Sequence, residues 1–254
     1  MLQTDRSNLV ALIMGEVTNP FYPEVLALLL KALRAAGLHP LIFAVDPGEV
    51  ADDVVEEVFR YRVDGVVITS ATLSAERARE CSRHEIPVVL LNRHVEDQAV
   101  LSVACDNAAA GREVADLLLD AGHVRPALIA GNPHDATDQD RAQAFLSRLA
   151  ERGHADVPQY FCENSYDDGA AGIHALFSGA SHPDAGSSSA SRPDAVFCLS
   201  DVVALGAVDA LRHSLGLRVP EDVSVVGFDN VPAAGWAAYR LTTIAQPREM
   251  MVAE

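Results

Sequence analysis

The sequence has little positive charge. Its 254 residues contain one lysine, Lys31, and 19 Lys and Arg together against 36 Asp and Glu, which gives a formal net charge of −17. An acidic surface repels the phosphate backbone of nucleic acids, so we do not expect this chain by itself to bind DNA. No apolar run approaches the roughly 20 residues that span a bilayer, and we therefore expect no membrane partner.

Several signatures of chemistry are missing as well. The four cysteines form no CxxC pair and have no histidine at metal-ligand spacing, which argues against a disulfide framework and against a metal site. The sequence has no GxSxG nucleophile motif, no GxGxxG after a strand and no P-loop, so we expect neither enzymatic activity nor a cofactor. The N-terminal residues lack the cleavage site of a secretion signal, which favours a cytoplasmic protein with reduced thiols.

The sequence does contain a regular alternation of short aliphatic runs with amphipathic stretches. Such apolar runs are typical of parallel strands covered on both faces, and the alternation predicts a doubly wound α/β fold. The Gly/Ser/Pro-rich residues 178–193 break the pattern and predict a flexible loop. The predicted strands are residues 9–14, 40–44, 65–69, 88–91, 102–104, 127–130, 195–199 and 223–227. The predicted helices are residues 22–36, 50–61, 75–84, 108–121, 139–152, 168–177 and 201–215.

Polar and aromatic side chains follow several of the predicted strands. In open α/β sheets ligands bind beyond the carboxyl ends of the strands, so these positions predict a binding cleft. The candidates are Asn19, Phe21 and Tyr22 after the first strand, Ser200 and Asp201 after residues 195–199, and Asp229 and Asn230 after residues 223–227.

Each candidate also has a purely structural interpretation. Phe21 and Tyr22 offer rings for stacking on a ligand, or they form a hydrophobic staple at the start of a helix beginning near Pro23. Arg141, in the first turn of the predicted helix 139–152, offers a planar fork to hydroxyls or a carboxylate. Taken alone, the position favours a surface arginine paired with Asp138 or Asp140 instead.

The remaining candidates are carboxylates and amides at strand ends and helix starts. Asp229 ends a buried strand, where a carboxylate must find hydrogen-bond donors, and either a ligand's vicinal hydroxyls or the following loop would supply them. Asp201 is expected mainly to cap its helix. For Asp106 and Asn107, helix capping competes with ligand contact. Trp236, the only tryptophan, either lines the mouth of the cleft or packs against the protein.

Motifs in a fixed order from about residue 7 to residue 247 resemble the LacI/GalR transcription regulators. The most specific pair is GLRVPEDVSVVGFDN followed by LTTIAQP. The chain departs from the family pattern at Ala144, where RxxGF has glycine, and at Tyr239, where proline usually precedes LTTI. The other matching segments are NLVALIMGEVTNPFYPEVLALLLKALRAAG, RVDGVVIT, IPVVLLNR, DNAAAGREVADLLLDAGH, RAQAF and RPDAVFCLSDVVALGAVDAL.

The resemblance implies two Rossmann-like three-layer α/β/α lobes of the type I periplasmic-binding-protein kind, with a ligand cleft between them. Residues 7–105 plus 245–254 would form the N-terminal lobe, and residues 106–244 the C-terminal lobe. The resemblance also implies a hinge at Asp106, Asn107 and Ile244. It places Arg141 and Asp229 on the ligand, and it favours a ligand contact for at least one of Phe21 and Tyr22.

The function implied is that of an effector-sensing domain for a sugar or sugar-like molecule, in which ligand-linked lobe closure controls DNA binding. Operator DNA would be bound only through the family's helix-turn-helix, which normally precedes the first strand. A periplasmic sugar-binding protein of an ABC transporter is the alternative on the same fold. The resemblance further implies a homodimer. Residues 72–84, a moderately apolar helix, offer a contact surface, although an ordinary outer helix packed on its own sheet is the simpler interpretation.

Overall fold

The computed structural model describes residues 6–15, 19–45, 51–69, 73–93, 100–133, 135–178 and 192–254. The chain divides into two compact units, one formed by Met1–Cys105 with Pro247–Glu254 and the other by Asp106–Gln246. None of the helices described is long and apolar enough to cross a membrane. Most of the predicted loop 178–193 lies outside the described residues.

The first unit is built on a five-stranded parallel sheet in the order β2-β1-β3-β4-β5. Alternate residues of β1 face opposite sides of this sheet. Ala11 and Ile13 belong to a buried cluster with residues of α2 and α3, while α1 supplies further buried residues such as Val25. The strands are β1 (Leu9–Met14), β2 (His39–Ala44), β3 (Gly65–Thr69), β4 (Val88–Leu91) and β5 (Leu101–Val103). The helices are α1 (Phe21–Ala35), α2 (Ala51–Val58), the short η1 (Phe59–Tyr61), α3 (Ala75–Arg83) and the C-terminal α8 (Arg248–Ala253), which contacts α1.

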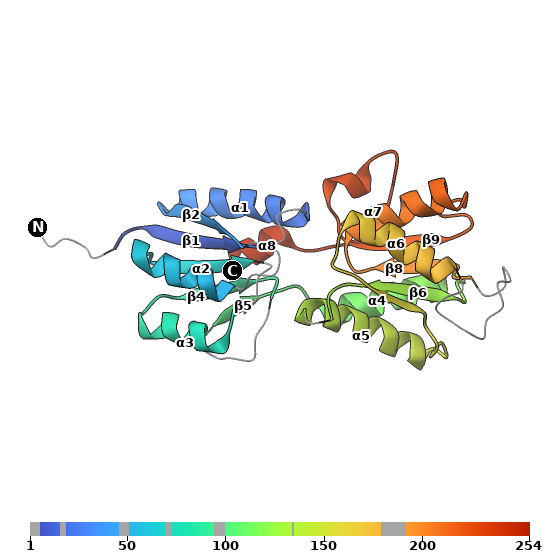
Figure 1. Ribbon diagram of the computed structural model, residues 1–254, viewed down its shortest axis with the longest axis horizontal. Helices are drawn as coiled ribbons and strands as arrows, with labels where there is room; N and C mark the ends of the chain where they lie inside the picture. Colours follow the sequence, from blue (N-terminus) through green and yellow to red (C-terminus); the bar gives the residue numbers. More distant parts are fainter. Residues whose placement is uncertain are drawn as a thin grey trace, which may run out of the picture. The chain divides into compact units, whose positions relative to one another are not determined.

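The second unit has a parallel sheet in the order β10-β9-β8-β6-β7, with α4 and α5 on one face and α6 and α7 on the other (Figure 1). The strands are β6 (Pro126–Ala130), β7 (Gln159–Phe161), β8 (Ala195–Cys198), β9 (Ser224–Asp229) and β10 (Thr242–Ala245). The helices are α4 (Asn107–Asp120), α5 (Ala136–Glu151), α6 (Tyr166–Phe177) and α7 (Asp201–Asp209), with the shorter turns η3 (Ala210–Ser214) and η4 (Pro232–Gly235).

Glycines let the paired helices of the second unit approach closely. A Cβ atom at Gly111 of α4 would lie 2.4 Å from the carbonyl oxygen of Arg141 in α5. On the other face, a Cβ at Gly206 of α7 would lie 1.9 Å from the carbonyl oxygen of Tyr166 in α6. Only a residue without a side chain fits at either contact, so these glycines set the spacing of both helix pairs.

The predicted α/β fold is confirmed, and most differences concern where elements begin. Helix α5 starts at Ala136, three residues before the prediction, because the Asp135 side chain caps it by accepting from the backbone N–H of Thr137 and Asp138. The strand predicted at 102–104 lies one residue earlier. Four elements were missed: β7 and β10, which are short edge strands with exposed residues, the short helix α8 and the turn η4.

In α3 the apolar residues Ala78 and Cys81 are buried in the core of the first unit, so this helix packs on its own sheet. The second compact unit extends two residues beyond the predicted limit at Ile244. The reason is that Ala245 pairs with Asp229 in the sheet and the Gln246 side chain donates a hydrogen bond to Asp229.

Candidate functional site

The carboxyl ends of the parallel strands β6, β8, β9 and β10 meet at one edge of the second sheet. Asp229 is the last residue of β9 and is buried. Its Oδ1 accepts a hydrogen bond of 2.7 Å from Nε2 of Gln246. The backbone of Asp229 has φ 116°, and Asn230 follows with φ 54°, conformations that non-glycine residues adopt at a cost. Strain of this kind is concentrated at functional sites.

Arg141 is brought to the same edge from α5. Its guanidinium carbon lies 3.8 Å from the ring centroid of Phe228, the residue before Asp229. Its Nε donates to Oδ1 of Asn107 at 2.7 Å, and its Nη1 donates to the Leu199 carbonyl at 3.0 Å. Arg141 is only 4% exposed, and among the described residues its Nη2 has no hydrogen-bond partner. A buried donor without a partner is costly unless something outside the chain accepts from it.

These contacts correct the surface interpretation of Arg141. The residue lies in the second turn of α5, not the first, because the helix begins at Ala136. Nη1 does lie 3.6 Å from Oδ1 of Asp138, but this pair is buried, and the guanidinium is held mainly by an amide, a carbonyl and an aromatic ring.

Asp201 has a different role from the helix cap that was expected. Ser200 occupies the N-cap position of α7, and the fully buried Asp201 carboxylate instead accepts from Val231 N at 2.8 Å and from the Thr243 hydroxyl at 2.6 Å. Burial raises the pKa of this carboxyl from 3.8 to about 6, against the opposing effect of its hydrogen bonds. Asp201 thus ties the start of α7 to the loop after β9, the loop that follows Asp229.

The other candidates of the second unit fall into two groups. Ser200 is buried, and its hydroxyl donates to Oδ1 of Asn164, while Asn107 at the start of α4 holds Arg141. Both side chains therefore lie at the carboxyl edge of the second sheet, where Arg141 also lies. Asp106 caps α4 by accepting from Ala109 N at 2.8 Å, as one of its predicted roles required.

Trp236 and Ile244 lie in the segment that follows β9. Trp236 ends the turn η4 and is 60% exposed, so it does not pack in the core. Ile244 pairs with Phe228 in the β10–β9 ladder. The hinge role predicted for Ile244, Asp106 and Asn107 remains a prediction.

In the first unit the candidates lie between β1 and α1. The Asn19 side chain accepts from Phe21 N at 3.0 Å and so starts α1 two residues before Pro23. Phe21 and Tyr22 are both buried, and their rings pack edge to face in a T-shaped pair at a centroid distance of 5.2 Å. This burial favours the packing interpretation of the two aromatic side chains, and their ligand contact remains a prediction.

Sequence reasoning missed two polar residues at the carboxyl edge of the first sheet. Thr69 ends β3 and Asn92 follows β4, and both are buried. Within the described part of the chain, neither Oγ1 of Thr69 nor Oδ1 of Asn92 has a hydrogen-bond partner. The signal was available, because both stand at the end of a predicted strand, as Asn19 and Asp229 do. Gln246, which holds Asp229, lies in the LTTIAQP motif, but no local pattern marks it as a partner of Asp229.

The side chains at the carboxyl edge of the second sheet are of the kinds that bind a ligand through hydrogen bonds. They offer a guanidinium N–H, a carboxylate and carboxamides, which together suit hydroxyl groups. Across the described ranges no group of three or more His, Cys, Asp or Glu side chains is placed to hold a metal ion. Three of the described cysteines, Cys81, Cys162 and Cys198, are buried, and burial raises the pKa of each of these thiols, which disfavours the reactive thiolate; Cys105 is partly exposed.

Known proteins resemble this chain in sequence and in fold. A family model described as "Periplasmic binding protein-like domain" matches residues 115–254. The HTH-type transcriptional repressor PurR of Vibrio vulnificus is 30% identical over 252 residues, which cover 97% of this chain and 72% of the repressor. The transcriptional regulator CelR in complex with cellobiose is 28% identical with a TM-score of 0.83, covering 97% of this chain and 75% of that one.

A LacI regulator from Lactobacillus casei with bound Tris gives the same TM-score of 0.83 at 26% identity, over 100% of this chain and 90% of that one. The similarity to these regulators covers 97–100% of this chain, and each of the two units has the parallel sheet with flanking helices that is expected for their ligand-binding part. The chain therefore belongs to the LacI family of transcriptional regulators and has the periplasmic-binding-protein-like fold of their effector domain.

Proposed function

We propose that this chain senses a small sugar or sugar-like effector at the carboxyl edge of the second sheet, and that effector binding controls DNA binding by the intact regulator. Because the two binding events would be linked, the effector changes operator affinity by the same factor as the operator changes effector affinity. The cellobiose complex of CelR supports a sugar as the class of ligand.

One observation carries the proposal: the Nη2 group of Arg141 is buried and has no partner among the described residues, although the rest of the guanidinium is firmly held. A ligand hydroxyl or ring oxygen would accept from it. Asp229 adds an acceptor for vicinal hydroxyls, and its orientation is set by Gln246. We assign ligand contact to these two residues first.

The other residues receive supporting roles in the proposal. Ser200, Asn19, Phe21, Tyr22 and Trp236 are further candidates for ligand contact. Asp201 lies in the same edge, and its two protein hydrogen bonds suit it to positioning the loop after β9. Asp106, Asn107 and Ile244 are proposed as hinge residues, where the chain passes from one compact unit to the other.

We further propose that the chain binds its ligand without turnover, as a homodimer in the cytoplasm, where a DNA-binding regulator acts. The named relatives are transcription regulators, which favours this interpretation over an enzyme or the binding protein of a transporter. A helix-turn-helix of the intact regulator would contact the operator.

A thermal-shift screen against sugars, nucleosides and amino acids would identify the effector, and titration calorimetry would then test the site. Loss of a charged hydrogen-bonding partner costs about 1.5–3 kcal/mol, so Asp229→Ala and Arg141→Ala should each weaken binding roughly ten- to a hundredfold. Arg148→Ala is the matched control, because Arg148 lies on the same helix but forms surface ion pairs with Asp116 and Glu151.

The control variant should bind the effector as the unmodified chain does. Unchanged affinity in both Asp229→Ala and Arg141→Ala would contradict the site assignment, and release of a converted product during calorimetry would contradict binding without turnover.

A further inference from the structure

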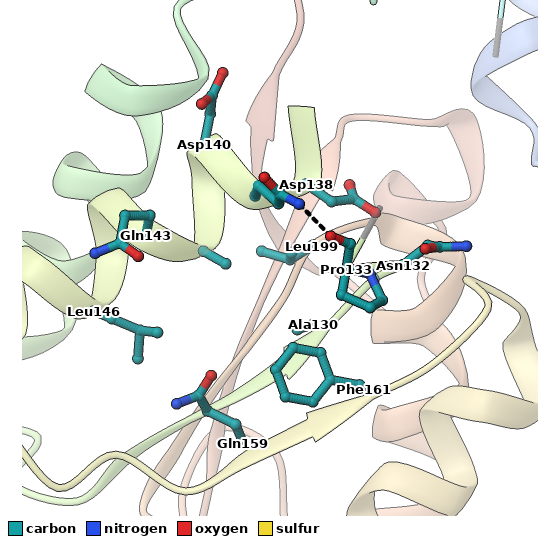
Figure 2. A pocket seen from close by; sticks show the side chains of 13 residues that line it. Ala130, Asn132, Pro133, Asp138, Asp140, Gln143, Leu146, Gln159, Phe161 and Leu199 are labelled. Atoms are coloured by element: carbon teal, nitrogen blue, oxygen red, sulfur yellow. Dashed lines mark hydrogen bonds between the residues drawn. The ribbon is translucent and has the colours of Figure 1, made fainter. Parts of the chain in front are cut away.

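We infer that the second unit contains an additional small-molecule pocket, between α5 and the edge strand β7, which takes a neutral, hydroxylated ring compound. The cavity has a volume of about 340 Å³, within the range of sites for small ligands. Figure 2 shows Gln143, Leu146, Gln159 and Phe161 around one hollow. Neither Arg141 nor Asp229 lines it, although Asp138 and Leu199, which contact Arg141, do, so the pocket is adjacent to the effector site proposed above but is not the same site.

The pocket arises because α5 does not cover the edge of the sheet. Helix α5 packs over the central strands, where the ring of Phe145 lies 5.0 Å from that of Phe197 in β8. Strand β7 is the outermost strand, and Tyr160 points to the opposite face, toward Gly172 of α6. Gln159 and Phe161 therefore point to the α5 side. The Phe161 side chain is left 56% exposed there.

Helix α5 supplies the facing wall. Gln139, Gln143 and Leu146 line the pocket at a spacing that places them on one face of the helix. The Gln139 side chain is fixed by donating to the Pro133 carbonyl, and the Gln143 side chain donates to Ser147 Oγ at 3.0 Å. A wall whose amides are already oriented loses little conformational entropy when a ligand binds.

The lining determines the class of ligand. Four carboxamides, which both donate and accept hydrogen bonds, suit hydroxyl groups, while Phe161 and Leu146 offer an apolar surface to a ring. Two aspartates are also among the lining residues, and none of the described lining residues is Lys, Arg or His. A phosphorylated or otherwise anionic compound is therefore disfavoured. The carboxamides are Asn132, Gln139, Gln143 and Gln159, and the carboxylates are Asp138 and Asp140.

Asp138 joins this pocket to the effector site. It lines the pocket, packs against Gly131 so closely that a Cβ there would lie 1.9 Å from its Oδ2, and stands 3.6 Å from Nη1 of Arg141. A ligand that displaced the Asp138 side chain would move a negative charge relative to the guanidinium of Arg141, the residue proposed to bind the effector. This coupling rests on the proposed function of Arg141, whereas the pocket itself does not.

Nuclear magnetic resonance of the ¹⁵N-labelled full chain tests the pocket with ribose, cellobiose and adenosine as probes and ribose 5-phosphate as the anionic counterpart. We expect at least one neutral probe to shift the side-chain amide signals of Gln143 and Gln159, with a dissociation constant on the order of 1 mM. Phe161→Ala should weaken this binding roughly tenfold, because it removes the exposed ring. Ribose 5-phosphate should bind more weakly than ribose.

The control is Asp229→Asn, which alters the effector site and leaves the pocket lining intact. The pocket is supported if a neutral probe still shifts the side-chain amide signals of Gln143 and Gln159 in Asp229→Asn but no longer shifts them in Phe161→Ala. This result does not depend on whether the effector site is where we propose it. Shifts confined to Asn107 and Gln246, and abolished by Asp229→Asn, would overturn the pocket while leaving the proposed function standing. The pocket is also overturned if no neutral probe shifts Gln143 or Gln159, and the ligand class is overturned if ribose 5-phosphate binds as tightly as ribose.

Discussion

Buried polar side chains fix the positions of the residues at the carboxyl edge of the second sheet. Asp229 keeps a backbone conformation that costs roughly 1–3 kcal/mol in a non-glycine residue, and such strain persists only where the surroundings over-determine it. Here Gln246 holds the side chain of Asp229, and Asp201 holds the loop that follows through Val231 and Thr243. The carboxylate proposed to meet the ligand is thus fixed by residues that do not need to touch the ligand themselves.

The carboxyl of Asp201 should make stability depend on pH. Its pKa is raised to about 6, so the folded chain binds a proton more readily than the unfolded chain, and this contribution is present below pH 3.8 and lost as pH rises through 6. Relative to Asp201→Asn, the unmodified chain should lose up to about 3 kcal/mol of unfolding free energy between pH 4 and pH 7. Urea unfolding of both proteins at several pH values measures this difference. A difference that stays constant with pH would contradict the raised pKa.

Among the elements, the contact between α4 and α5 bears most directly on the site, because α5 carries Arg141. Gly111 allows α4 to approach the Arg141 backbone, and ion pairs join the outer surfaces of the two helices. These exposed pairs are worth little individually, so the position of α5 depends mainly on the close contact at Gly111 and on the buried face of the helix.

Gly111→Ala should therefore displace α5, lower the free energy of unfolding by about 1–3 kcal/mol and weaken effector binding. Gly206→Ala is the matched variant on the opposite face of the sheet. It should destabilise the protein by a similar amount with a smaller effect on binding, because it forces α7 against α6 and not against Arg141. Gly235→Ala, where the added Cβ meets open space, should change neither the free energy of unfolding nor the effector affinity.

Thermal unfolding measures the change in stability of each variant, and calorimetry measures the change in effector affinity. Equal losses of affinity in Gly111→Ala and Gly206→Ala would show that the α4–α5 contact has no special part in binding.

For the whole molecule, the acidic charge and the family membership point in the same direction. A formal net charge of −17 favours solubility over nucleic-acid binding by this chain, which agrees with a sensing rather than a DNA-contacting part. Regulators that bind paired half-sites have two-fold symmetry, so the family membership favours a pair of chains. Because Leu73, Ala78 and Cys81 are buried in the core of the first unit, they do not form the contact surface that residues 72–84 had suggested.

We accordingly expect a homodimer in solution, with a mass twice the 27.1 kDa of one chain. Size-exclusion chromatography with light scattering at tens of micromolar, with and without the effector, measures this directly. A monomer under both conditions would contradict the expected dimer without bearing on the effector site.

The alternation of apolar runs with amphipathic stretches was enough to predict the fold class and most elements, because both depend on residues close together in the sequence. It also placed Asp229 at a strand end. The edge strands β7 and β10 escaped prediction, since three- and four-residue strands with exposed positions leave no apolar run. The partners of Asp201, the burial of Arg141 and the pocket beside Phe161 were decided only by the tertiary structure. Each depends on residues brought together across the chain, such as Asp201 and Thr243 or Arg141 and Leu199, and no local pattern encodes which buried polar group will meet which partner.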